Sequence, residues 1–562
     1  MEKIWLNHYE AGVPAEINPD AYPSLATMFD HNCAQYKDRI AFTNMGTNIT
    51  YGELKELVEN FAAYLQQVLG VKKGDRVGLM LPNCLQYPVA LFAIFKAGAI
   101  AVNFNPLYTP DEVIHQVKDS GAEIMLVMAN FAHTLEAALP QLKLKHVIIT
   151  ELADLFPWPK RLVINFIVNK IKKIVPAWNI DHYINFLDVI NDGKKHKLTP
   201  VPLSNTDIAF LQYTGGTTGL AKGAMLTHRN MIANTEQASA WVKPALTEKQ
   251  QIIVTALPLY HIFSLLANCL VFFNLGGRNL LITNPRDIPN FVQELARYPF
   301  TAITGVNTLF NALLNNSNFG KVDFSALKLA LGGGMAVQHA VAERWQNTTH
   351  KPLIEAYGLT ETSPAVCINP INTPSYNGTI GLPISSTEVS IRNEAGEELG
   401  YDTPGELWVK GPQVMLGYWE KPEETAKVLM PDGWLRTGDI ATINSQGYVK
   451  IVDRAKDMII VSGFNVYPNE IEDVLSASPL VKEVAVVGVP SPVSGESVKA
   501  FIVPKDNTVT KTDIINYCRE HLTGYKIPRL VEFREELPKS NIGKILRRAL
   551  RDEAKNAAPE HE

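Results

Sequence analysis

Cysteine is scarce in this chain of 562 residues, which contains only five: Cys33, Cys84, Cys269, Cys367 and Cys518. Their number is odd, their spacings are wide and no Cys-x-x-Cys pair occurs. A disulfide framework or a zinc knuckle is therefore disfavoured, and a reducing compartment is indicated. A basic excess is also absent, because 52 Lys and Arg stand against 57 Asp and Glu, for a net charge of −5. This balance argues against a dedicated nucleic-acid-binding protein.

Long hydrophobic runs are equally rare. The N-terminus has no basic patch followed by an apolar core, so it does not resemble a secretory signal. Residues 252–275 carry no formal charge, and a membrane-spanning helix needs about 20 apolar residues. However, Pro258, His261, Asn268 and Asn274 interrupt this stretch. We interpret it as a buried segment of the core.

What is present is an alternation of strands and helices. Residues 75–81, 100–104 and 123–128 are typical of buried strands, and residues 86–97 and 110–119 are typical of helices. This order predicts the α/β class, with parallel-rich sheets covered by helices on both faces.

The alternation of strands and helices gives way to a different pattern in the second half of the chain. Residues 379–452 show short strands separated by Gly, Pro and Asp turns, which predicts a small β-barrel-like lobe. The charged segment 453–457 follows it, and residues 458–562 again mix strands and helices. We expect this last part to form a separate small α+β domain.

One segment breaks the alternation. Residues 158–178 carry five basic side chains and no acidic one, with apolar residues between the charges and a tryptophan at each end. A basic amphipathic helix of this kind can lie in a membrane interface. The alternative is a surface helix packed on its own domain, and the sequence leaves both open.

The sharpest local motif is the glycine- and threonine-rich stretch 213–223, directly after a predicted strand. Glycines let backbone N–H groups approach a ligand closely, and N–H groups with hydroxyls form an anion-binding concavity. It is not a Walker A loop, because Ala221 and Gly223 flank Lys222 where that pattern requires Gly before the lysine and Ser or Thr after it. The stretch predicts a triphosphate site.

Three more motifs follow along the chain. Residues 355–362 set Glu361 between two threonines, residues 432–439 place Asp439 after a tight turn, and residues 537–544 put Lys544 on a turn near the C-terminus. Each alone is explained as a core glutamate, a turn aspartate or a solvated lysine. Together, in this order, they indicate one site.

This set of motifs resembles the ATP-dependent, AMP-forming acyl-CoA synthetases of the acyl-adenylate-forming superfamily, from about Tyr22 to Arg551. Within the superfamily the chain is most similar to bacterial long-chain fatty acyl-CoA synthetases, notably over 432–463 and 284–289. The resemblance implies an adenylate-forming domain in residues 1–452, a hinge in residues 453–457 and a mobile C-terminal domain in residues 458–562.

The resemblance also implies the chemistry. A long-chain fatty acid and ATP form an acyl-AMP intermediate and pyrophosphate, with Mg²⁺ on the phosphates. The thiol of coenzyme A then attacks the acyl carbon, AMP leaves, and the acyl-CoA supplies β-oxidation and lipid synthesis. It further implies a cytoplasmic enzyme, peripheral on the membrane face, with a homodimer as the candidate assembly and no nucleic-acid partner.

Site residues are carried over by motif. The resemblance places the β- and γ-phosphates on a loop, Mg²⁺ on Glu361 with Thr214, and Thr360 at the α-phosphate. Lys544 is expected to bridge the carboxylate and the α-phosphate. The loop comprises Thr214, Gly215, Gly216, Thr217, Thr218, Gly219 and Lys222. The expected nucleoside contacts are Gly333, Gly334, Ala356, Tyr357, Asp439 and Arg454, with Tyr357 stacked on adenine and Asp439 on the ribose hydroxyls.

The acyl and CoA sites are expected from the same resemblance. His261 is expected beside the carboxylate, although a lone histidine in an apolar run is more often a core residue. The expected fatty-acid pocket comprises Tyr260, His261, Leu265, Gly305, Val306 and Met335. Lys456 is the expected hinge pivot. The expected CoA path is Ser462, Gly463 and Phe464.

Three alternatives remain open at this point. They are a ligase for medium-chain or aryl carboxylates, a fatty acyl-AMP ligase that serves a carrier protein, and a lipid-capture module without turnover.

Overall fold

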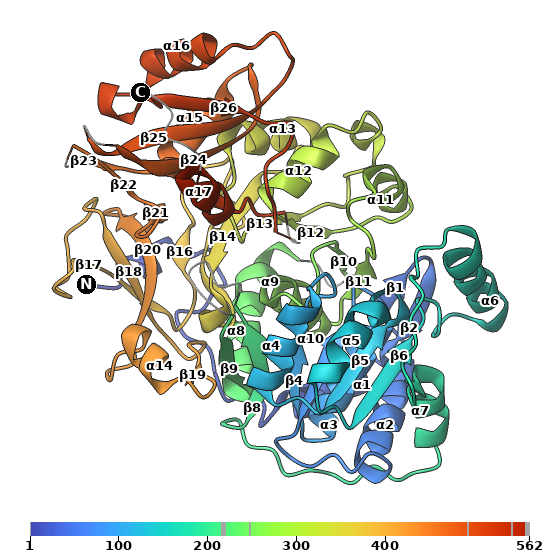
Figure 1. Cartoon of the computed structure of the whole chain (residues 1–562). Coiled ribbons are helices and arrows are strands. Elements are labelled where there is room, and N and C mark those ends of the chain that lie inside the picture. The colour runs from blue at the N-terminus through green and yellow to red at the C-terminus, as the bar shows by residue number, and fades with distance from the viewer. Residues whose placement is uncertain are drawn as a thin grey trace.

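Two large, mostly parallel sheets form the bulk of the molecule (Figure 1). The computed structural model describes residues 2–214, 221–246, 249–462, 464–491, 494–540 and 543–556. The first sheet has nine strands, in the order β16 (Leu382–Pro383), β15 (Ala365–Ile368), β14 (Leu353–Gly358), β13 (Leu329–Gly332), β12 (Ala302–Gly305), β10 (Ile252–Thr255), β11 (Arg278–Leu281), β1 (Ile40–Asn44) and β2 (Thr47–Thr50).

The second sheet has eight strands. Their order is β19 (Gly417–Tyr418), β9 (Gly223–Thr227), β8 (Ile208–Tyr213), β4 (Ile100–Asn103), β3 (Arg76–Met80), β5 (Ile124–Met128), β6 (His146–Thr150) and β7 (Ile184–Asn185). Strands β3 to β8 pair in parallel, and β9 and β19 add an antiparallel edge. The predicted α/β class with parallel-rich sheets is confirmed.

Successive side chains along a strand point to opposite faces of its sheet and therefore belong to different apolar cores. Ile253 and Ala302 pack into a core shared by both sheets, whereas their neighbours Val254 and Ile303 face the opposite side, as the period of two along a strand requires. The shared core holds α1 (Leu25–Gln35), α2 (Tyr51–Gln67), α3 (Gln86–Lys96) and α8 (His228–Val242). The outer faces carry α11 (Ile288–Leu295), α12 (Asn307–Leu314) and α13 (His339–Thr349) on one sheet, and α4 (Pro110–Ser120) and α5 (Ala132–Ala138) on the other. The large domain is therefore a five-layer α/β stack.

The lobe that the sequence predicts as β-barrel-like is instead an antiparallel sheet of four strands. Their order is β17 (Glu388–Arg392), β18 (Gly405–Lys410), β20 (Leu435–Ile443) and β21 (Val449–Arg454). A turn at residues 455–457 leads from β21 into the small domain.

The small domain has its own sheet and two apolar cores. Its strands are β23 (Phe464–Val466), β22 (Ile459–Val461), β25 (Gly495–Pro504) and β24 (Val481–Ser491), with β26 (Leu530–Phe533) also paired to β25. Helices α15 (Pro468–Ala477) and α16 (Lys511–His521) cover one face, and α17 (Arg547–Asn556) covers the other. This part folds as the α+β unit that the sequence predicts.

The uncharged stretch 252–275 is part of the large core. It forms β10, α9 (Ile262–Ser264), a π-helical turn over Leu265–Leu270 and α10 (Val271–Asn274), and most of its apolar side chains are buried. Among the described residues, no helix combines the length and the apolar character needed to cross a bilayer.

The basic segment after residue 157 projects from the edge of the large domain (Figure 1). It forms α6 (Trp158–Phe166) and a π-helical turn over Ile167–Ile171. No side chain of α6 is buried.

Candidate active site

A cavity of about 1570 Å³ lies between the two domains. The strands β12, β13 and β14 run in parallel toward it and end at Gly305, Gly332 and Gly358. The crevice at the carboxyl ends of parallel strands is the usual ligand site in α/β sheets. The small domain closes the cavity with residues that include Lys544 and Arg547.

The base of the glycine- and threonine-rich loop is fixed by a hairpin. Strands β8 and β9 pair antiparallel up to Tyr213 and Gly223, and the backbone N–H of Thr214 donates to the Lys222 carbonyl at 3.0 Å. The Lys222 ammonium pairs with Glu424 at 2.9 Å. Both Thr214 and Lys222 line the cavity. The remaining predicted loop residues, Gly215, Gly216, Thr217, Thr218 and Gly219, lie outside the described residues.

Glu361 lies on the same wall as Lys222. The Tyr418 hydroxyl donates to Glu361 Oε1 at 2.6 Å, and the Tyr418 ring lies 4.6 Å below the Lys222 ammonium. Burial and the Glu361 carboxylate raise the pKa of Tyr418, so the phenol keeps its proton and remains a donor. Tyr418 thus links Glu361, the predicted magnesium ligand, to Lys222, the lysine predicted to bind phosphate. Tyr418 and Glu361 are 57 positions apart, so the spacing of the motifs does not show this contact.

The expected nucleoside residues meet at the edge of β14. A Cβ atom on Gly333 would lie 3.1 Å from both the Ala356 carbonyl oxygen and the Phe263 ring, so the close packing of this wall favours glycine. Gly334 has φ +76°, a conformation that favours glycine as well. Thr360 lines the cavity nearby.

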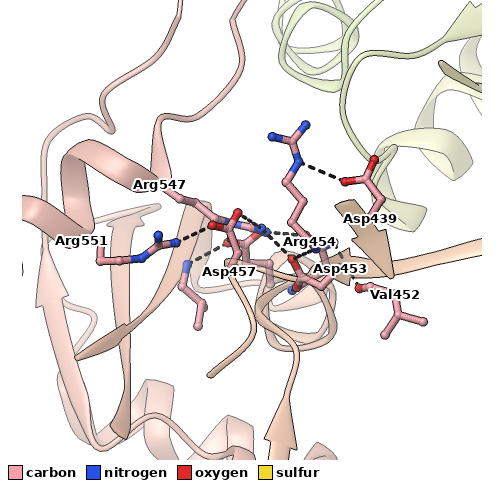
Figure 2. Close-up of polar contacts among 10 residues, drawn as sticks. Asp439, Val452, Asp453, Arg454, Asp457, Arg547 and Arg551 are labelled. Carbon is pink, nitrogen blue, oxygen red and sulfur yellow. Dashed lines mark hydrogen bonds and ion pairs between the residues drawn. The ribbon is translucent and has the colours of Figure 1, made fainter. Parts of the chain in front are cut away.

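Tyr357 connects this wall to the four-stranded lobe. Its hydroxyl donates to Asp439 Oδ2 at 2.5 Å, and Arg454 Nε lies 3.4 Å from Asp439 Oδ1. Asp439 and Arg454 face each other across β20 and β21, which explains the pairing (Figure 2). Asp439 is buried, yet each of its oxygens has a partner, as a buried carboxylate requires.

Lys544 enters the cavity from the small domain. Gly543, just before it, has φ +83°, and its carbonyl accepts a hydrogen bond from Thr308 Oγ1 of α12 at 3.1 Å. Burial, followed by the nearby Arg454 guanidinium, lowers the pKa of the Lys544 amine to about 7. A low-dielectric site with nearby positive charge disfavours the ammonium in this way.

His261 lines the cavity near Lys544. Its Nδ1 accepts from the Phe263 N–H at 3.3 Å, which leaves the proton on Nε2. Burial, followed by the Lys544 charge, lowers the pKa of His261 to about 4. The imidazole is therefore neutral at pH 7 and can donate a hydrogen bond through Nε2.

The apolar part of the cavity differs in detail from the expected pocket. Tyr260, His261 and Met335 line it, but within the described residues Leu265, Gly305 and Val306 do not. In the π-helical turn over Leu265–Leu270, Leu266 and Ala267 line the cavity, and both Leu265 and Leu266 belong to the buried core.

Residues that the sequence did not indicate complete this wall. They are Ala238, Val242, Val271, Phe272 and Leu329. Their only sequence signal is hydrophobicity, which does not distinguish a lining residue from a core residue.

The expected CoA-path residues lie apart from the cavity. Ser462 has φ +50° and its N–H donates to the Ser494 carbonyl at 2.8 Å. Phe464 is 55% exposed and stacks on Tyr525 with ring centroids 4.7 Å apart. Among the described residues neither lines the cavity, whereas Lys456 does. Gly463 lies outside the described residues.

Comparison with known proteins identifies the family. A family model described as AMP-binding enzyme matches residues 29–419, and the AMP-binding enzyme C-terminal domain matches residues 470–544. The chain belongs to the AMP-binding enzyme family. The relationship that the motifs predict is confirmed.

Relatives and solved structures agree with this assignment. The chain is 58% identical, over 99% of both chains, to a protein of Escherichia coli O6:H1 named long-chain-fatty-acid–CoA ligase. It is similar to the crystal structure of the anthranilate CoA ligase AuaEII in complex with anthranoyl-AMP (TM-score 0.83, 25% identity, 96% of this chain and 98% of that one). It is also similar to ATP-bound MatB from Rhodopseudomonas palustris (TM-score 0.81, 27% identity, 94% and 99%).

The lowered pKa of Lys544 predicts unusual reactivity. Only the neutral amine reacts with an acylating reagent, so Lys544 should be half-maximally labelled near pH 7, with ordinary surface lysines following near pH 10. Peptide mass spectrometry after brief labelling across a pH series measures this. Labelling of Lys544 that rises together with the surface lysines would contradict the burial of the amine.

Proposed function

We propose that this chain is an ATP-dependent ligase that activates long-chain fatty acids to acyl-CoA through an acyl-AMP intermediate, releasing AMP and pyrophosphate. The observation that carries the proposal is the position of Lys544. It lies close to Asp439 of the nucleoside site and to His261 of the acyl site, in the cavity that Glu361 and Tyr357 also line. The full-length similarity to a long-chain-fatty-acid–CoA ligase supports the same conclusion.

The first half-reaction joins two anions, so it depends on positive charge and alignment. We infer that Thr214, Lys222 and the adjoining loop hold the β- and γ-phosphates, with Thr360 at the α-phosphate. Asp439 holds the ribose hydroxyls, and Tyr357 fixes that carboxylate while its ring borders the base. Arg454 contributes charge beside the ribose. Lys544 contacts both the carboxylate and the α-phosphate, and binding two anions returns its amine to the charged form.

Glu361 and Thr214 fit the binding of a magnesium ion. Across the described ranges, no group of three or more His, Cys, Asp or Glu side chains converges on a metal site. Magnesium commonly takes one or two protein oxygens and completes its coordination with phosphates and water. Bound in that way, the ion would neutralise phosphate charge. The Tyr418 hydroxyl orients the Glu361 carboxylate for that role.

The second half-reaction requires coenzyme A to reach the acyl carbon. We infer that the small domain then turns about Lys456, within the turn that joins β21 to β22, so that Ser462, Gly463 and Phe464 border the CoA path. The outward position of Ser462 and Phe464 supports this movement, because the present orientation presents Lys544 to the cavity and leaves them outside it. Such hinges are short segments whose dihedral angles change.

The apolar wall favours an alkyl substrate over an aryl carboxylate. It extends from His261 along the helical segment 262–272 to Ala238 and Val242 of α8.

A capture module would not need Glu361, Asp439 and Lys544 gathered in one cavity. A fatty acyl-AMP ligase would share the first half-reaction but would not require CoA.

Replacing Lys544 tests the proposed function directly. Lys544→Ala should abolish oleate-dependent release of pyrophosphate, because its contacts exist only while the α-phosphate is attacked. The same variant should still convert supplied oleoyl-AMP and CoA to oleoyl-CoA. Equal loss of both half-reactions in a folded variant would contradict the assigned role, and absence of oleate-dependent pyrophosphate release by the unmodified enzyme would refute the function.

Filling the apolar wall tests the chain-length assignment. Ala238→Phe places a ring where α8 borders the cavity, so kcat/KM for oleate should fall roughly tenfold or more while that for octanoate changes little. A series of fatty acids from eight to eighteen carbons measures the shift. An equal effect on all chain lengths would show that α8 does not border the acyl chain.

We further propose that α6 docks the enzyme on an anionic membrane. Asn165 and Asn169 point toward the protein, where each side-chain amide donates to Glu151 at 2.7 Å. Four apolar residues of α6 lie on another face and are more than half exposed. They are Trp158, Leu162, Val163 and Phe166. The segment therefore contacts the protein through Asn165, Asn169 and the apolar Ile164 and Val168. It leaves a second, larger apolar face open to the solvent, which favours docking over a helix that buries all of its apolar side.

The basic residues complete this surface. Lys170, Lys172 and Lys173 are exposed next to the apolar face, where they complement anionic headgroups. The Lys160 ammonium donates to Oγ1 of Thr47, the first residue of β2, at 3.1 Å and so holds α6 to the β1–β2 hairpin. A docked enzyme would collect fatty acids that partition into the bilayer.

Vesicle binding tests this surface. Replacing Lys170, Lys172 and Lys173 by Gln should weaken binding to anionic vesicles roughly a hundredfold, at about 1 kcal/mol per charge, and leave turnover of soluble decanoate intact. The control replaces the exposed Lys118, Lys505 and Lys511 by Gln, which changes the net charge equally. Equal weakening by both triple variants would mean that α6 has no special role.

A further inference from the structure

A buried carboxylate marks the boundary between the two domains. Asp453 is the second-last residue of β21, opposite Ile440 of β20, and therefore belongs to the four-stranded lobe of the large domain. Its side chain is 0% exposed. Burying a charge is unfavourable unless charged or polar partners form hydrogen bonds with it. The groups that bind Asp453 therefore determine where this carboxylate is stable.

The partners of Asp453 include two groups of the small domain. Asp453 Oδ1 accepts from Arg547 Nη1 at 3.2 Å and from the backbone N–H of its own neighbour Arg454 at 2.8 Å (Figure 2). Asp453 Oδ2 accepts from the backbone N–H of Asn469 at 2.8 Å. The side-chain amide of Asn469 (Nδ2) also donates to the Val452 backbone carbonyl at 3.3 Å. Asn469 lies in the first turn of α15, whose N–H groups have no partner within the helix. Three bonds thus cross the boundary at one point.

Arg547 is otherwise bound within the small domain. Its Nε donates to Glu472 Oε1 at 2.9 Å, and its guanidinium also contacts Asn469 and Asp457. These three partners follow Lys456 in the chain, so they would turn together with Arg547. Asp453 is the partner that would stay behind with the large domain.

The same contacts fix the position of Lys544. Arg547 begins α17 three residues after Lys544. On the other side of the lysine, the Gly543 carbonyl accepts from Thr308 Oγ1 of the large domain at 3.1 Å. The segment from Gly543 to Arg547 is therefore held to the large domain at both ends, with Lys544 between them.

We propose that Asp453 is an interdomain latch, which with Arg547 and Asn469 favours the orientation that presents Lys544 to the cavity. Hydrogen bonds depend strongly on direction, so rotation of the small domain breaks all three contacts at once. The latch stabilises the adenylation orientation relative to the orientation that admits coenzyme A. Weakening it shifts the population toward the latter. Asp453 and Arg547 are positioning residues, and this inference rests on the proposed function.

Asp453→Asn tests the latch, because it removes the charge and keeps the size of the side chain. The ratio of two rates is measured, namely pyrophosphate release with oleate and ATP, and thioester formation from supplied oleoyl-AMP and CoA. The ratio should shift roughly tenfold in favour of thioester formation, as expected from loss of a charge-assisted hydrogen bond. A residue that merely supports folding would lower both rates together.

Arg551→Gln is the matched control. Arg551 Nη2 pairs with Asp457 Oδ1 at 2.5 Å in the same cluster (Figure 2), but both residues follow Lys456 and would turn together. The ratio of the two rates should therefore stay unchanged in this variant. An equal shift in Arg551→Gln and Asp453→Asn would overturn the latch, because the effect would then come from the cluster as a whole.

A second variant protects the test against misfolding. Asn469→Ala removes the side-chain bonds to the Val452 carbonyl and to Arg547 and leaves Asp453 in place, so it should shift the ratio in the same direction by a smaller factor. If the unmodified enzyme forms acyl-AMP and neither variant moves the ratio, the latch is wrong and the proposed function stands. If the unmodified enzyme forms no acyl-AMP, the proposed function fails first.

Discussion

The confinement of Lys544 is the constraint on which the rest of the site depends. Its amine lies in a buried position where Arg454, Lys456 and Arg547 oppose its charge and Asp439 favours it, with burial as the largest effect on its pKa. Burying an ammonium among cations is unfavourable unless anions arrive. The site is therefore prepared for anionic ligands, and the proposed carboxylate and phosphate supply them.

This confinement requires the small domain to be placed accurately. The segment of Lys544 meets the large domain through Thr308 at one end and through the Asp453 cluster at the other. Between the domains, the chain passes through a turn of three residues, and each domain has its own apolar core, which fits the proposed rotation of the small domain. A site divided in this way can present one set of residues for each half-reaction.

Much of the fold follows from local sequence. The strand predicted at residues 123–128 forms β5 over Ile124–Met128, and the helix predicted at 110–119 forms α4 over Pro110–Ser120. Both are strongly periodic segments with clear capping or turn residues, and Thr109 with Glu112 forms a capping box at the start of α4. The motifs identified Lys544, Asp439 and Glu361, and all three line the cavity.

Other features depend on contacts that no local pattern contains. The resemblance singles out Leu265 for the acyl pocket, whereas its neighbour Leu266 lines the cavity, and hydrophobicity does not distinguish the two positions in a mostly apolar segment. The bonds from Tyr418 to Glu361 and from Arg547 to Asp453 join residues 57 and 94 positions apart. The outward apolar face of α6 became clear only from the inward bonds of Asn165 and Asn169 to Glu151.

A distance measurement between the domains tests the central claim most directly. The five cysteines are buried, so spin labels can be attached to Glu343→Cys on α13 and Lys511→Cys on α16, both exposed positions. With a non-hydrolysable acyl-adenylate analogue alone, the labels should show the one distance that corresponds to Lys544 facing the cavity. Adding coenzyme A should populate a second distance as the small domain turns. An unchanged single distance with coenzyme A would contradict the view that one mobile domain serves both half-reactions.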